Sequence, residues 1–261
     1  MQRAFVAALV VGTLCSTIGT YVVLRRLSFI GGGIAHASFA GIVVAYLKGF
    51  DYYVGAAVVA IVTALGIGYV NRRARVSLDT AIGVLFTGAF ALGVFLMSLR
   101  PTYNVDLQGF LFGNILAVSR ADLLLILALS AIVAISLALL YRPLLYTSFD
   151  PVVAEASGIK AGAVAYALLV LLALTIVVSL ESVGIVLVAA LLVTPAATAY
   201  QLTRRFTTML VLSACIGAFA SLAGLYASYY LHAASGATIV LLVTAMFFMA
   251  MLSRLRSRRA V

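Results

Sequence analysis

Residues 161–202 read AGAVAYALLVLLALTIVVSLESVGIVLVAALLVTPAATAYQL, and Glu181 is the one charged side chain among them. The stretch consists of two apolar runs on either side of the polar pair Glu181-Ser182. Each run has about the 20 residues that a helix needs to cross the roughly 30 Å hydrocarbon core of a bilayer. The stretch therefore predicts a hairpin of two membrane-spanning helices.

The rest of the chain repeats this pattern. Its 261 residues are 65% hydrophobic and 9% charged, with a mean hydropathy of +1.23, whereas about a quarter of a soluble domain is charged. The fold class is all-α, a polytopic helical membrane protein forming one domain over residues 1–261. Nine spans are predicted at roughly 4–24, 29–47, 54–70, 78–99, 122–140, 161–180, 183–202, 207–231 and 236–252. The number falls to eight if the first does not cross fully.

The basic residues predict the orientation in the membrane. They lie singly or in short clusters between apolar runs, which argues against a nucleic-acid partner despite the net charge of +10. With the C-terminal tail in the cytoplasm, 13 of the 17 bases lie on that side, as cytoplasmic loops prefer. The four on the other side are Arg3, Lys48, Arg100 and Arg120. The sequence therefore predicts a multi-pass protein of the cell (cytoplasmic) membrane, with its N-terminus outside and its C-terminus inside.

Motifs for catalysis are absent from the sequence. There is no phosphate-binding G-x-x-x-x-G-K-[ST], and no C-x-x-C, H-E-x-x-H or G-x-S-x-G. Ionisable residues within the spans are too sparse for a nucleophile with its base, so the chain is not expected to be an enzyme. Cys15 and Cys215 lie in apolar runs, where small buried residues are the favoured interpretation.

Three ionisable residues are candidate metal ligands. His36 lies within the second span, and an imidazole in a span is a functional hypothesis by default. Its alternative role is a hydrogen bond between helices. His232 ends the eighth span, where a residue at the membrane interface is the alternative. Glu181 could attract cations outside the membrane, although a solvated turn residue is the favoured interpretation.

Two interruptions suggest a transport pathway. Gly31, Gly32 and Gly33 open the second span, and Pro195 lies in the middle of the seventh. Helices broken at membrane depth are tolerated where they line a cavity or are buried against protein. Kinks that serve packing alone would look the same.

The stretch 148–159 predicts a short capped helix on the cytoplasmic side. Asp150 precedes Pro151 at the first helical position, and Gly158 follows the end. The helix is too short and too polar to span, so it could rest on the membrane or dock into a groove of a partner.

Several motifs in sequence order resemble one family, the membrane permeases of bacterial ABC importers for zinc, manganese and iron. They are VLRRLSFIG at 23–31, IAHASFAG at 34–41, DTAIG at 79–83, FLFGNILAVS at 110–119, DP at 150–151 through Gly158, LLVTPAATA at 191–199 and SGATI at 235–239.

The resemblance implies a homodimeric permease that carries the metal between its two copies, with no permanently bound cofactor. It implies two cytoplasmic ATP-binding subunits that drive alternating access, and an extracytoplasmic metal-binding protein. The region 146–160 resembles the coupling helix that contacts the ATPase. The stretch 104–122, which overlaps the external segment 100–121, resembles the docking surface for the binding protein. The coupling residues are Phe149, Asp150, Pro151, Ala154 and Gly158.

The candidate metal site departs from the family pattern. Many members have an acid at the position of Gly32, four residues before the histidine, and another at the position of His232. A shift from carboxylate to imidazole favours zinc over manganese as the transported ion. The alternative function, a self-contained secondary carrier or channel, would more often bury several acids, which this chain lacks.

Overall fold

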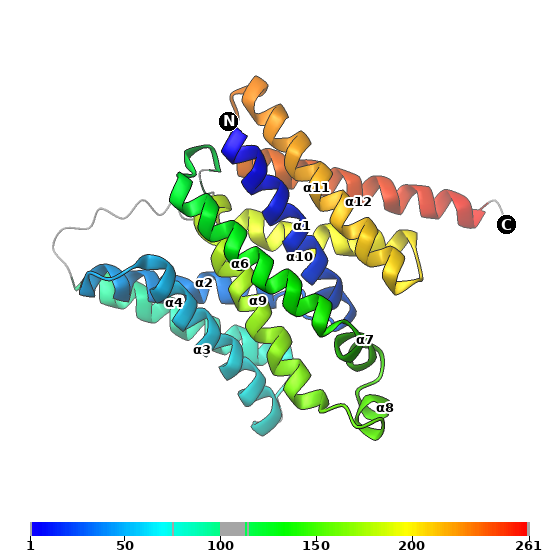
Figure 1. Ribbon diagram of the computed structural model, residues 1–261, viewed down its shortest axis with the longest axis horizontal. Coiled ribbons are helices and arrows are strands. Elements are labelled where there is room, and N and C mark those ends of the chain that lie inside the picture. Colours follow the sequence, from blue (N-terminus) through cyan, green and yellow to red (C-terminus); the bar gives the residue numbers. More distant parts are fainter. Residues whose placement is uncertain (1, 75, 100–112, 114, 260–261) are drawn as a thin grey trace. The chain divides into compact units, whose positions relative to one another are not determined.

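The computed structural model describes residues 2–74, 76–99, 113 and 115–259, and within them every regular element is a helix (Figure 1). Nine helices of the described chain are long and apolar enough to cross a membrane, which confirms the predicted spans. They are α1 (Gln2–Leu24), α2 (Ile30–Lys48), α3 (Tyr52–Arg73), α4 (Leu78–Ser98), α6 (Arg120–Leu139), α9 (Ala161–Val183), α10 (Ile185–Leu202), α11 (Phe206–Leu231) and α12 (Ser235–Arg259).

Three short elements lie between these helices: η1 (Ile115–Ala117), α7 (Tyr141–Phe149) and α8 (Pro151–Ala156). Most of the predicted external segment, residues 100–112 and 114, lies outside the described residues.

Local side chains determine where several helices begin. The Asp51 carboxylate accepts a hydrogen bond from the backbone N–H of Val54 at 3.1 Å, and the Ser77 hydroxyl accepts one from Thr80 at 3.1 Å. These side chains satisfy backbone donors that have no partner within the first turn of α3 and α4.

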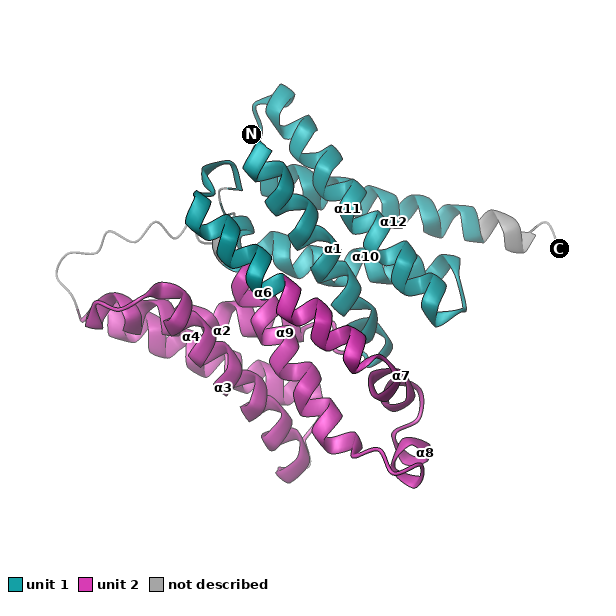
Figure 2. Cartoon of the chain, in the orientation of Figure 1, with its two compact units in different colours: residues 1–26, 108–130, 179–261 teal, residues 27–107, 131–178 magenta. Residues whose placement is uncertain are grey.

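The chain divides into two compact units (Figure 2). Unit 1 contains residues 1–26, 108–130 and 179–261, and unit 2 contains residues 27–107 and 131–178. The boundaries fall inside α6 and α9, so neither unit is a continuous stretch of chain. The single domain over residues 1–261 stays a prediction.

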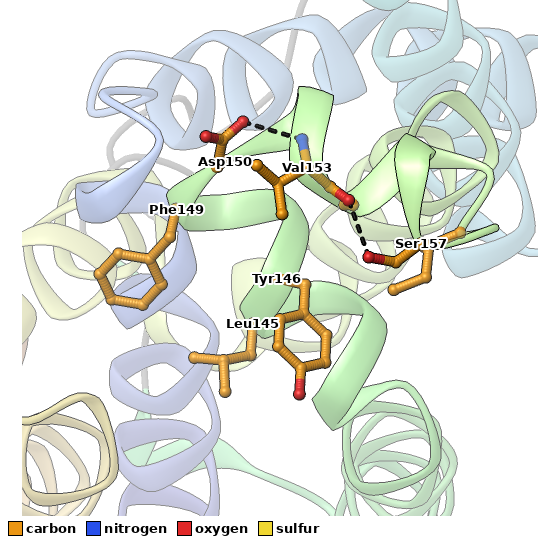
Figure 3. Close-up of a pocket in the computed structure, with 8 residues that line it drawn as sticks. Leu145, Tyr146, Phe149, Asp150, Val153 and Ser157 are labelled. Carbon is orange, nitrogen blue, oxygen red and sulfur yellow. Dashed lines mark hydrogen bonds between the residues drawn. The ribbon is translucent and has the colours of Figure 1, made fainter.

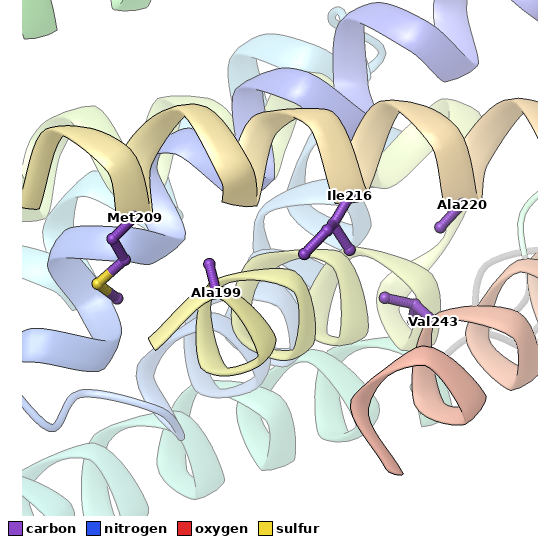
Figure 4. Close-up of a cluster of buried hydrophobic side chains, with 5 residues drawn as sticks. All are labelled: Ala199, Met209, Ile216, Ala220 and Val243. Atoms are coloured by element: carbon purple, nitrogen blue, oxygen red, sulfur yellow. The ribbon is translucent and has the colours of Figure 1, made fainter. Parts of the chain in front are cut away.

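In unit 1, α1 packs on α10 and α11, and α12 packs on both of the latter. Figure 4 shows Met209, Ile216 and Ala220 of α11 facing Ala199 of α10 and Val243 of α12 in a buried apolar cluster. Since lipid provides little hydrophobic drive between helices, close packing of this kind must hold the unit together.

Small residues bring α1 and α11 into close contact. A Cβ added to Gly217 would lie 2.7 Å from the Cβ of Ser16 and against the Ser16 hydroxyl, and one added to Gly12 would meet Ser221. The runs 12–16 and 217–221 therefore pack on each other, because their small side chains let the two backbones approach closely.

In unit 2, α2 packs against α3 and α4. The guanidinium of Arg72, at the end of α3, lies 5.1 Å from the ring centroid of Tyr166 on α9, a cation–π distance. This contact joins the end of α3 to the helix that follows α8.

Candidate functional site

His36 lies on α2 in unit 2, half-buried against two aromatic rings of α4. Its ring centroid is 6.0 Å from that of Phe86 and 5.8 Å from that of Phe90. Its Nδ1 is 2.7 Å from the carbonyl oxygen of Gly32, one turn earlier. Because a carbonyl can only accept, Nδ1 carries the hydrogen, and Nε2 of the neutral ring keeps its lone pair. This is the tautomer in which Nε2 can ligate a metal ion.

Space is open beside this histidine. A Cβ added to Gly32 would meet nothing within 4 Å, so the backbone leaves room for a side chain one turn from His36. Gly31, Gly32 and Gly33 form the opening turn of α2, which continues without interruption to Lys48. The predicted helix break is therefore wrong at these glycines, because the turn keeps its helical hydrogen bonds, such as Gly33 N–H to Phe29 O at 3.0 Å.

His232 caps the C-terminus of α11 in unit 1. Its backbone is left-handed, with φ of 50°, and its N–H bonds the carbonyl of Ser228. Histidine is among the non-glycine residues enriched in this conformation. The side chain is exposed. The structure thus places His232 at the end of the helix, as the sequence predicted.

Glu181 lies in the last turn of α9 and not in a connecting turn. The predicted turn is wrong because α9 continues past Glu181, and the single residue between α9 and α10 is Gly184, with φ of 81°. The side chain of Glu181 lies outside the described part of the chain.

Within the described residues, no three His, Cys, Asp or Glu side chains are grouped closely enough to hold a metal ion. His36 belongs to unit 2, whereas His232 and Glu181 belong to unit 1. Each candidate ligand is therefore defined by the surroundings within its own unit.

Pro195 lies inside α10, which also runs on without a break. Proline has no N–H to bond the carbonyl four residues earlier, that of Leu191. The hydroxyl of Ser16 on α1 donates to this carbonyl at 3.3 Å, and the Ser213 hydroxyl on α11 donates to the Ser16 carbonyl at 2.7 Å. A neighbouring helix thus supplies the donor that the proline removes, so the helix need not break.

The predicted capped helix is confirmed as α8. Asp150 Oδ1 accepts hydrogen bonds from the backbone N–H groups of Val152 at 3.0 Å and Val153 at 3.1 Å, and Pro151 occupies the first position. Gly158 ends the turn with φ of 82°. Ala154 is the buried residue of this helix, at 1% exposure.

The sequence did not predict the helix α7, because the one short helix expected in this region was the capped helix within 148–159. Leu144 and Thr147 of α7 are buried, while Tyr146 and Phe149 are exposed. The signal available in the sequence was the spacing of Leu144 and Thr147, three residues apart after Pro143, which puts both on one face of a helix. Between α7 and α8 lies a groove of about 580 Å³ (Figure 3). It is lined by Leu145, Tyr146, Phe149, Asp150, Val153, Ala154, Ser157 and Ile159.

Comparison with known proteins places these features in a family. The sequence model of the ABC 3 transport family matches residues 1–254. The chain is 46% identical to the manganese transport system membrane protein MntC of Halalkalibacterium halodurans, over 96% of this chain and 86% of that protein. It is 43% identical to a protein of the same name from Listeria monocytogenes, over 97% of this chain and 90% of that protein.

A solved structure agrees with the sequence matches. One chain of PsaBC from Streptococcus pneumoniae, solved in complex with a Fab, superposes with a TM-score of 0.85 at 36% identity. The match covers 95% of this chain and 90% of that one.

Proposed function

This chain belongs to the ABC 3 transport family, and from that membership we propose that it is the membrane-spanning subunit of an importer for divalent transition metal ions. The observation that carries the proposal is the end-to-end likeness to relatives named for manganese transport. Alternating access, powered by ATP hydrolysis in separate subunits, moves the ion. The second candidate, a self-contained carrier or channel, has no comparable support.

Two ATP-binding subunits dock on the cytoplasmic face, and α8 is the coupling helix. Its side-chain cap at Asp150 and its glycine stop make it a rigid, separately built element. Phe149, at the end of α7, is 63% exposed and Val153 of α8 is 59% exposed, which leaves apolar surface for a partner. Rigidity is what allows a displacement of the ATPase to reach α9.

An extracytoplasmic metal-binding protein delivers the ion to the stretch 104–122.

The permease works as a homodimer, and one face of α4 supports this part of the proposal. Gly83 and Gly88 have nothing within 4 Å of an added Cβ, and Thr87 between them is exposed. In a membrane, small residues on an open helix face allow a second helix to approach closely.

His36 is a ligand for the ion on its way through, and His232 and Glu181 are further candidate ligands. The pathway also includes Gly31, Gly32, Gly33 and Pro195.

The relatives are named for manganese, whereas an imidazole donor without a carboxylate at position 32 favours zinc. We therefore propose that the transported ion is manganese. We expect zinc to compete with manganese for transport more strongly here than in a permease that has a carboxylate at position 32.

The test is metal-dependent ATP hydrolysis and manganese uptake in liposomes that hold this chain, its ATPase and the metal-loaded binding protein. Phe149→Asp is expected to lower stimulated hydrolysis at least about tenfold, since it places a charge in an apolar contact. His36→Ala is expected to abolish uptake but leave ATPase binding unchanged.

The two variants control for each other. A misfolded permease would lose both ATPase binding and metal uptake, whereas His36→Ala should lose uptake alone. Uptake in liposomes that lack the ATPase would overturn the proposal in favour of the carrier.

A further inference from the structure

Four helices of unit 1 meet at one end of the unit. An apolar cluster there contains Ala199 of α10 and Met209 of α11, and Leu24 of α1 and Met246 of α12 pack against it (Figure 4). Leu24 is the last residue of α1, while Ala199 lies in the last turn of α10 and Met209 in the first turn of α11. The residues that follow α1, connect α10 to α11 and end α12 therefore belong to the same end of unit 1.

Under the predicted orientation this end faces the cytoplasm, and its charged residues are all basic. Eight arginines occupy the helix ends and connections there: Arg25, Arg26, Arg204, Arg205, Arg254, Arg256, Arg258 and Arg259. The acids of unit 1 are Asp122 in the first turn of α6 and Glu181 in the last turn of α9, which the same orientation places on the opposite side of the membrane. We call the eight arginines the basic end of unit 1.

Unit 2 carries both signs of charge on the same side of the membrane. Its bases there are Arg72, Arg73, Arg75, Arg142 and Lys160, and its acids are Asp79, Asp150 and Glu155. The preference of cytoplasmic loops for lysine and arginine explains an excess of bases in both units. It does not explain why every cytoplasmic acid belongs to unit 2, because acids contribute little to that preference. Unit 1 alone thus presents an end suited to an anionic partner.

The helix α12 relates this charge to the membrane. Phe248, Met249 and Leu252, shortly before Arg254, are 51%, 59% and 55% exposed, which suits contact with lipid tails. The helix continues from Arg254 to Arg259, and the sequence has three of the eight arginines in those last five residues. At 1.5 Å per residue they span about 8 Å along the axis, close to the thickness of the headgroup region on one side of a bilayer.

We propose that the basic end of unit 1 binds the anionic headgroups of phospholipids in the cytoplasmic leaflet. Of its described side chains, those of Arg26, Arg204 and Arg205 are exposed, and guanidinium groups can pair with phosphate through two hydrogen bonds. Basic segments next to a spanning helix are attracted by the negative potential of this leaflet. An acidic protein surface would also attract arginines, but the exposed apolar side chains just before Arg254 favour lipid. The inference depends neither on the transported ion nor on the ATPase.

The test uses the absence of tryptophan from the sequence, because a single introduced tryptophan then reports on the lipid around it. Leu252→Trp places one two residues before Arg254. The matched control, Leu231→Trp, places one at the end of α11 that lies on the opposite predicted side, where Leu231 is 71% exposed. The permease is reconstituted in vesicles of phosphatidylcholine and phosphatidylglycerol, with bromine on the acyl chains of one lipid at a time. Quenching of the tryptophan fluorescence by bromine then measures which lipid lies beside it.

We expect phosphatidylglycerol to be enriched at least about fivefold around the tryptophan of Leu252→Trp, and less than about twofold around that of Leu231→Trp. Replacing Arg254, Arg256, Arg258 and Arg259 together by glutamine should bring the first value below about twofold. Replacing them by lysine should retain most of the enrichment, because the charge is kept. Raising the salt concentration from about 0.1 to about 1 M should lower it as well, because salt screens exposed charges.

Equal enrichment at the two tryptophans, or enrichment that survives the glutamine substitutions, would overturn the proposal. If the glutamine variant does not fold, the salt series on the parent decides, and enrichment insensitive to salt would contradict lipid binding through charge. A third result also overturns it: no enrichment at either tryptophan, together with weaker binding of the purified ATPase to the glutamine variant. The basic end would then bind an acidic protein surface.

Discussion

Gly32 is the residue at which the metal preference of this chain can be changed. Gly32→Asp places a carboxylate one turn before His36, in space that is open in the structure. Carboxylates suit manganese better than an imidazole alone. We expect the ratio of manganese to zinc uptake to rise about tenfold, measured by competition between the two ions in liposomes.

The matched control is Gly32→Asn, which has nearly the same shape without the charge. It should leave the ratio within about twofold of the parent. If both substitutions shift the ratio equally, the effect comes from shape, and the carboxylate argument fails.

Ser16 supports Pro195 from another helix, which predicts that the two residues are coupled energetically. Ser16→Ala removes the donor to the Leu191 carbonyl, and we expect a loss of about 1 kcal/mol in the free energy of unfolding. In Pro195→Ala, the new backbone N–H can bond that carbonyl, so the same serine substitution should have little effect. Unfolding in mixed micelles across all four variants measures the coupling.

Ser38 is the control for this cycle. Its buried hydroxyl bonds the Ile34 carbonyl of its own helix at 2.8 Å, away from any proline, so Ser38→Ala should show the same small effect in both backgrounds. An equal loss from Ser16→Ala with and without Pro195 would show that the proline is irrelevant.

The cap of α8 could be predicted from the sequence because Asp-Pro and Gly act locally. The surroundings of His36 could not. Its bond to the Gly32 carbonyl follows from helical spacing, but the rings of Phe86 and Phe90 come from α4, some fifty residues later in the chain. Packing partners of this kind depend on which helices meet, which hydropathy does not specify.

At the scale of whole helices, α1 and α11 are held by contacts that allow no added methyl group. We expect Gly217→Ala to lower the free energy of unfolding by about 1–3 kcal/mol, because its Cβ would overlap Ser16. Gly66→Ala is the control, since its Cβ would make an ordinary contact with Leu85 at 3.5 Å. Thermal unfolding of the detergent-solubilised permease would measure both, and equal melting temperatures would contradict the proposed close packing.

The nine spanning helices were predictable because each is a long apolar run, whereas the short helix α7 was not. The helix α7 has only nine residues and one buried side, so it resembles a loop in a hydropathy plot. Glu181 misled for a related reason: a charge between two apolar runs suggests a turn, yet α9 continues past Glu181 and ends only before Gly184, three residues later.

At the scale of the whole molecule, the sequence predicts the number of crossings, and the structure adds how they divide. Each unit combines segments from distant parts of the chain, with α6 and α9 contributing to both. Hydropathy gives no information on such a division, because all nine apolar runs have similar hydropathy and none indicates which other runs it packs against. The side of the membrane on which each loop lies is set by the basic residues, and it can be measured directly.

Three exposed positions test the orientation in a background in which Cys15 and Cys215 are replaced by alanine. With nine crossings and the C-terminus inside, cysteines at Gln2 and Ala233 should react with a membrane-impermeant maleimide in right-side-out vesicles. A cysteine at Ser157 should react only after the vesicles are opened, because three crossings, α9 to α11, separate it from Ala233. If α1 does not cross, Gln2 should instead be protected like Ser157, while Ala233 stays reactive. Protection of Ala233 would reverse the whole orientation and move α8 and its groove away from the ATPase.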